Sequence, residues 1–252
     1  MEMIKMDIAK ERLICFTGII VMVLFVSCIG RLKEAPILLF NGKGTSPNDV
    51  KAISTILSSN HLDFALVNSN QLNGLDTNQL RKYKLIIMPG GNFIEIGKNL
   101  MKATSRTVQK AVHQGLNYLG ICAGGFLAGN TRNNSFNIAE GVSFKFYSSE
   151  DKGIRKAAVA ITNADSTIIE HYWEDGPQFT GWGEVVSTYP DGTPATVQGH
   201  FGSGWLVLTG IHPEAPESWR KEFHFSTSME LSHQYTAEMI RAALDKKPLP
   251  HF

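Results

Sequence analysis

The first half of the chain repeats one unit, in which a short apolar run leads into a turn and then into a helical pattern. Such unbroken runs are typical of strands buried on both faces, because a half-exposed strand alternates apolar with polar residues. Strands that alternate with helices form a parallel sheet covered by helices. The predicted strands are residues 36–40, 64–67, 85–88 and 116–121.

The remaining elements are predicted from caps and periodicity. Ser46 offers a capping hydroxyl, Pro47 suits a first helical position and Asp49 lies in the first turn, so a helix should run to about Asn60. Residues 108–114 should close another helix, and 229–244 carry a helical apolar spacing. Short β-rich runs in the second half should extend the sheet or decorate its edge, at 157–161, 167–170, 185–189, 195–198 and 205–208.

Composition narrows the class of protein. The chain is 43% hydrophobic and 19% charged, as expected of a globular domain. Its 24 Lys and Arg nearly balance 23 Asp and Glu, and no block of like charge is present, which argues against nucleic acid as a partner. The cysteines, Cys15, Cys28 and Cys122, are too far apart for a disulfide framework or a paired-thiol zinc site.

The N-terminal 30 residues have the order of an export signal. Basic residues precede a run without charge from Leu13 to Gly30, which we interpret as a signal or membrane anchor over residues 1–30. Near its end, the segment Leu24-Phe25-Val26-Ser27-Cys28 resembles a bacterial lipoprotein processing site that would lipidate Cys28. An uncleaved anchor, ordinary cleavage and a buried core helix are the alternatives. We expect a cell-envelope protein facing the periplasm or exterior and held at the membrane.

Cys122 lies in a pattern typical of a nucleophile. A predicted strand leads into it, glycines stand two residues to either side, and small residues open a helix after it. Such a strand-to-helix turn strains the backbone and exposes the side chain, and the positive end of the helix dipole favours the thiolate. The alternative is a small buried apolar side chain, a common place for cysteine. From the glycine spacing alone both interpretations stay open.

Two further segments should meet Cys122 at the carboxyl edge of the sheet. Pro89-Gly90-Gly91 ends the preceding strand, so the N–H groups of Gly91 and Ala123 could form an oxyanion hole, although a purely structural turn is the alternative. His212 and Glu214 follow the last strand and flank Pro213. If that segment is extended, both side chains point the same way and the carboxylate can orient the imidazole. The remaining histidines, His171 included, show no metal-ligand spacing, and we expect neither a metal nor a cofactor.

Taken in order, these motifs resemble the class I glutamine amidotransferase superfamily. Within it they are most similar to the biotin-protein ligase N-terminal domain family, which also has an early turn like 41–45 and an aromatic-Gly-Pro stretch like 172–177. The similarity spans about residues 35–219. It implies a flavodoxin-like, doubly wound, mostly parallel sheet with a β-rich C-terminal half, in one domain over residues 35–252. It also implies a triad of Cys122, His212 and Glu214.

The resemblance has limits. No segment resembles the Gly-Arg-rich nucleotide loop of biotin ligases, so we expect no biotin transfer by these residues. Nor does any of them resemble a synthetase domain that would accept ammonia. The leading hypothesis is a cysteine hydrolase or amidotransferase-like protein that acts on a small-molecule amide. The alternative is a non-catalytic domain that binds a small molecule or a protein, in a pocket to which Trp173, Trp182 and Tyr189 contribute unless they belong to the core. A purely structural envelope protein would leave the motif order as coincidence.

The mature N-terminus tests the export prediction. If Cys28 is lipidated, intact-mass spectrometry of the membrane fraction should show a chain that begins at a diacylated Cys28 and has 225 residues, since 252 − 27 = 225. An intact, unlipidated Met1 in the soluble fraction would contradict the prediction.

Overall fold

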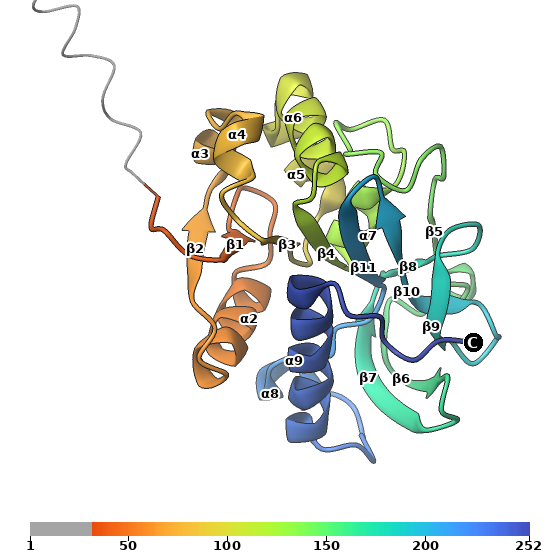
Figure 1. Cartoon of the computed structure of the whole chain (residues 1–252). Coiled ribbons are helices and arrows are strands. Elements are labelled where there is room, and N and C mark those ends of the chain that lie inside the picture. The colour runs from red at the N-terminus through yellow and green to blue at the C-terminus, as the bar shows by residue number, and fades with distance from the viewer. Residues whose placement is uncertain (1–31) are drawn as a thin grey trace, which may run out of the picture. The chain divides into compact units, whose positions relative to one another are not determined.

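A computed structural model describes residues 32–252 (Figure 1). The predicted signal or anchor and Cys28 lie outside this part of the chain. Among the described residues, no helix is both long and apolar enough to cross a bilayer.

The first half forms the predicted parallel sheet. Its strands are β1 (Ile37–Phe40), β2 (Phe64–Val67), β3 (Leu85–Met88) and β4 (Asn117–Ile121), and β11 (Gly204–Thr209) joins them from the far end of the chain. They pair in the order β2-β1-β3-β4-β11, all parallel. Every residue of β1, β3, β4 and β11 is buried, as their apolar runs require. The carboxyl ends of β3, β4 and β11 therefore lie side by side.

Antiparallel strands continue the same sheet beyond β11. The order runs on through β10, β9, β6 and β7, so the second half extends the sheet as predicted. A separate two-stranded sheet pairs β5 with β8. The bounds are β5 (Lys145–Phe146), β6 (Lys156–Asn163), β7 (Ile168–Glu174), β8 (Pro177–Gln178), β9 (Glu184–Thr188) and β10 (Pro194–Phe201).

Helices cover both faces of the parallel part, which makes the sheet doubly wound. The helices α2 (Pro47–Ser59) and α9 (Met229–Asp245) share one apolar core with alternate residues of the strands, while α6 (Lys102–His113) and α7 (Ala123–Ala128) pack on the opposite face. Figure 1 shows α2 and α9 together on one side and α3 to α6 on the other. The shorter helices are α3 (Ser69–Asn73), α4 (Thr77–Leu80), α5 (Phe93–Asn99) and α8 (Glu217–Arg220), with a 3₁₀ turn at Glu150–Lys152.

The helix α7 lies unusually close to the sheet. A Cβ atom on Gly124 would stand 2.0 Å from the carbonyl oxygen of Met88, and one on Gly120 would stand 2.7 Å from the backbone of Gly124. Only residues without a side chain permit this approach. The two glycines therefore fix the start of α7 against β3 and β4.

Replacing Gly124 should loosen this contact. In Gly124→Ala the methyl group meets backbone, which cannot rotate away, so we expect the free energy of unfolding to fall by about 1–3 kcal/mol. Urea denaturation measures the loss. Gly199→Ala is the control, because its methyl would meet the ring edge of Trp182 at 3.2 Å and would touch backbone only at an ordinary contact distance of 3.7 Å, at Gly183. Equal stability of the two variants would contradict the packing described here.

Candidate active site

Cys122 occupies the predicted strained turn between β4 and α7. Its backbone has φ 47° and ψ −101°, a sparsely populated conformation for a residue with a side chain, at a cost of about 1–3 kcal/mol. The turn is held by a 2.8 Å hydrogen bond that its N–H donates to the carbonyl of Thr209 at the end of β11. Cys122 is also the N-cap residue of α7. The predicted elbow geometry is thus present.

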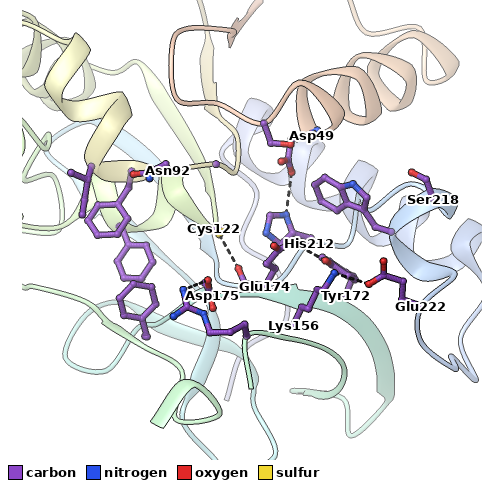
Figure 2. Close-up of a pocket in the computed structure, with 18 residues that line it drawn as sticks. Asp49, Asn92, Cys122, Lys156, Tyr172, Glu174, Asp175, His212, Ser218 and Glu222 are labelled. Atoms are coloured by element: carbon purple, nitrogen blue, oxygen red, sulfur yellow. Dashed lines mark hydrogen bonds and ion pairs between the residues drawn. The ribbon is translucent and has the colours of Figure 1, made fainter. Parts of the chain in front are cut away.

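The Cys122 side chain is buried but lines a pocket. Its exposed fraction is 5%, and with Gly91 and His212 it lines a cavity of about 640 Å³. The thiol donates a 3.6 Å hydrogen bond to the carbonyl of Glu174 at the end of β7 (Figure 2). Within residues 32–252 the structure records no hydrogen bond between this sulfur and the ring of His212. Cysteine and histidine therefore share one cavity without direct contact.

His212 and Glu214 are paired as predicted. Nδ1 of His212 lies 2.8 Å from Oε1 of Glu214, and both side chains are buried. The backbone N–H of His212 donates a 2.8 Å bond to Tyr172 on β7. The backbone is extended at His212 itself, which forms a bridge with Tyr172, but the extended conformation does not continue to Glu214. The next residues form a turn closed by a 3.1 Å bond from the N–H of Ala215 to the carbonyl of His212, and this turn brings the carboxyl group back to the ring.

Asp49 is a site residue that the sequence analysis did not assign. Its Oδ1 lies 3.1 Å from Nδ1 of His212, and the side chain is fully buried. Figure 2 shows Asp49 directed at the His212 ring from one side, with Tyr172 and Glu174 on the other. The available signal was position: Asp49 follows the turn after β1, at the carboxyl edge where Cys122 and His212 lie. From the sequence, Asp49 is instead interpreted as an acid that stabilises the first turn of a helix.

The buried charges determine the protonation of His212. Burial acts to lower the pKa of this ring, but its electrostatic interactions with Cys122, Asp49 and Glu214 outweigh burial and raise the pKa well above its usual value. The imidazolium form is consequently favoured at neutral pH. A protonated ring can deliver a proton to a departing amine.

Two backbone N–H groups predicted to form an oxyanion hole are free to do so. Neither Gly91 nor Ala123 donates its N–H to another of residues 32–252. Gly91 is exposed and lines the cavity, whereas Ala123 is buried as the first residue of α7. Their shared role on one oxygen stays a prediction.

The cluster of Asp49, His212 and Glu214 is the place in the described chain that most resembles a metal site. One ligand atom from each lies within 4.8 Å of the others. The Nδ1-to-oxygen distances of 2.8 and 3.1 Å are hydrogen-bond lengths, whereas two ligands of a tetrahedral zinc ion stand about 3.3 Å apart. These distances favour a shared proton.

Aromatic side chains form two walls of the cavity, and they differ from those considered in the sequence analysis. Trp173 and Tyr189 are buried in a second core, as the core interpretation expects, and Trp182 does not line the cavity either. On one side stand Phe93, Phe126 and Phe146, with ring centroids 4.5 to 6.3 Å apart; on the other Tyr172 and Trp219, 5.3 Å apart.

Paired charges stand at the rim. Arg155 bonds to Asp175, and Lys156 lies 2.6 Å from Glu222. These side chains are partly or largely exposed, so water and salt screen the pairs and each adds little to stability. The cavity therefore combines apolar walls with a rim of both charges.

Comparison with known proteins agrees with the motifs. Residues 35–140 match the family described as "Biotin-protein ligase, N terminal". The predicted family resemblance is confirmed. A "Biotin--protein ligase" of Schizosaccharomyces pombe (strain 972 / ATCC 24843) is 26% identical over 160 residues, which cover 52% of this chain. The match covers only 25% of the yeast protein, so the biotin-protein ligase relationship concerns a quarter of that relative's length.

Solved structures agree on the fold. PurLQS from Thermotoga maritima has a TM-score of 0.55 at 18% identity, over 82% of this chain and 99% of that one. A structure titled glutamine amidotransferase has a TM-score of 0.52 at 17% identity, over 81% and 98%. Both are similar in fold to this chain, which agrees with the doubly wound sheet predicted from the motifs.

His171 lies in β7 beside the site but belongs to the core. It is fully buried against the ring of Tyr235 at 4.9 Å, and neither ring nitrogen has a hydrogen-bond partner among the described residues. Burial, with the charge of Arg220, lowers its pKa from 6.5 to about 3. The folded protein thus keeps this histidine neutral.

This histidine should make the fold acid-sensitive. Its pKa is lower in the folded than in the unfolded chain, so the stability that it contributes is complete above about pH 6.5 and is lost as the pH falls towards 3. His171→Phe keeps a ring without the titrating group, and we expect its free energy of unfolding to fall less between pH 7 and 4 than that of the wild type. The free energies come from urea denaturation at each pH. An equal fall in the wild type and in His171→Phe would contradict the assignment of this acid sensitivity to His171.

Proposed function

We propose that this protein is a cysteine-dependent amide hydrolase of the glutamine amidotransferase-like type. The observation that carries the proposal is the strained Cys122 turn, which opens into the same cavity as an imidazole backed by carboxylates. A strained nucleophile beside a cationic ring is the arrangement that acyl transfer through a thioester requires.

The reaction would proceed in two steps. Cys122 attacks the carbonyl carbon of the amide as the thiolate, its proton having passed to His212; the C–N bond breaks, and His212 gives this proton to the departing amine. Water then attacks the thioester while His212 takes a proton from it, the C–S bond breaks, and the carboxylic acid leaves with the thiolate and the protonated His212 restored. The N–H groups of Gly91 and Ala123 would bind the oxyanion, and removing one such donor costs about 2.7–4 kcal/mol of barrier.

The cavity supports a substrate larger than a bare carboxamide. Its volume of about 640 Å³ lies within the usual range of small-molecule pockets. The phenylalanine wall would accept an apolar group, and the rim charges would accept polar ends. A small molecule or a segment of another protein fits this description.

A binding function without catalysis is the second candidate. One observation favours it: the thiol of Cys122 bonds to the carbonyl of Glu174 and makes no bond to His212. Thermal stabilisation by a ligand that persists in Cys122→Ala, without turnover, would support this alternative.

We further propose that the protein works at the cell envelope, attached through Cys28 or an uncleaved anchor. This proposal rests only on the residues from Leu13 to Gly30.

Selective alkylation tests the hydrolase proposal. Iodoacetamide at neutral pH should label Cys122 stoichiometrically, as located by peptide mapping, and the label should disappear in Cys122→Ser. His212→Gln should slow the labelling about 100-fold, because the thiolate loses its cationic partner. His200→Gln is the matched control, since His200 is exposed on β10 and does not line the cavity.

The alkylation rate of Cys122 in the native protein is compared with its rate in the unfolded chain. If Cys122 of the native protein reacts no faster than Cys122 in denaturant, the hydrolase proposal fails and the binding alternative gains support.

A further inference from the structure

We propose that Asp49 is a positioning residue that carries the negative charge opposite the His212 ring, while Glu214 orients the same ring as a neutral, hydrogen-bonded carboxyl group. The predicted triad contains only one acid, Glu214. The proposal adds Asp49 as a second acid and gives the two side chains different roles. The part that His212 plays in the reaction rests on the proposed function, whereas the location of the charge does not.

Both acids reach the same ring nitrogen. Nδ1 carries one hydrogen and lies 2.8 Å from Oε1 of Glu214 and 3.1 Å from Oδ1 of Asp49. The second oxygens, Oε2 and Oδ2, are buried without a partner among the described residues. Two ionised carboxylates this close repel each other in a medium with little water, so one proton on the pair is favoured.

The surroundings determine which acid ionises. Asp49 is the third residue of the 13-residue helix α2, where the positive end of the dipole stabilises an anion, and its N–H bonds to Ser46. Glu214 lies in a turn and has no such support. Burial raises the pKa of Glu214 to about 8, against the attraction of His212. Burial also acts to raise the pKa of Asp49, but His212 and hydrogen bonds outweigh it and lower that pKa.

Backbone hydrogen bonds between two turns hold Asp49 in place. The N–H of Ser46 donates a 3.0 Å bond to the carbonyl of Gly90, and that of Asn92 a 2.8 Å bond to Gly44. Gly90 leaves room for the pair, because a Cβ atom there would stand 2.5 Å from Cε1 of His212 and 3.1 Å from both carboxylate oxygens of Asp49. The glycine turns after β1 and β3 thus position Asp49 against the ring of His212.

The titratable groups that face His212 come from four places. Cys122 approaches from the β4–α7 turn, Asp49 from α2, Tyr172 from β7 at a ring distance of 6.0 Å, and Glu214 from the same loop. Tyr172 donates its hydroxyl to Glu174 at 2.6 Å, and burial first of all raises its pKa well above the usual value, so it stays neutral as His212 titrates. The two acids and the thiol are therefore the groups whose charge can move the titration of His212.

NMR titration of the His212 Cε1–H resonance, assigned by its loss in His212→Gln, tests the inference on the full chain. Asp49→Asn should lower the pKa of His212 by about 1–3 units, because it removes the adjacent charge and keeps the shape. Glu214→Gln should move it by less than about half a unit, since a neutral group replaces a neutral group. Asp49→Glu, which keeps the charge, is a further variant should the asparagine variant not fold, and it should titrate close to the wild type.

The inference is overturned if Glu214→Gln produces the large shift and Asp49→Asn does not, if neither moves the titration, or if Asp49→Glu titrates far from the wild type. Its failure differs from failure of the proposed function. An unreactive Cys122 with the expected titrations removes the hydrolase and keeps the charge on Asp49, whereas a reactive Cys122 with unmoved titrations does the reverse.

Discussion

The backbone contact between α7 and the strands β3 and β4 is the constraint on which the rest of this structure depends. Because Gly120 and Gly124 carry no side chain, the helix begins directly on the sheet, and Cys122 is forced into a conformation that most residues avoid. The strain is held by the fully buried strands β4 and β11, whose register aligns Thr209 with Ile121. A stable core thereby maintains an unfavourable local geometry at its carboxyl edge.

The parallel strands and the antiparallel extension of the sheet together enclose the cavity around that turn. The parallel strands supply Cys122, Gly91 and the segment of His212, while β7, from the antiparallel extension, supplies Tyr172 and the carbonyl of Glu174. The bridge between Tyr172 and His212 joins the two halves of the sheet at the site. The β-rich second half is thus part of the cavity wall, and a sheet without it would leave His212 exposed.

The sequence predicts the parallel half closely because burial on both faces leaves an unbroken apolar run, as in Leu85–Met88. It predicts β7 less well: the expected strand ends at residue 170, yet the ladder continues to Glu174 through buried His171 and Trp173. Asp49 is harder still, because its contact spans 163 residues and depends on turns that pair only in the folded chain. The phenylalanine wall has no sequence signature, since its members come from two short helices and a two-residue strand.

A crystal structure of the protein covalently modified at Cys122 by an electrophilic glutamine analogue tests the central claim most directly. The account predicts the analogue in the cavity, its oxygen about 2.7–3.1 Å from the N–H groups of Gly91 and Ala123, and the ring of His212 turned to the sulfur. An analogue that leaves Cys122 unmodified, with the thiol still bonded to the carbonyl of Glu174, would contradict it.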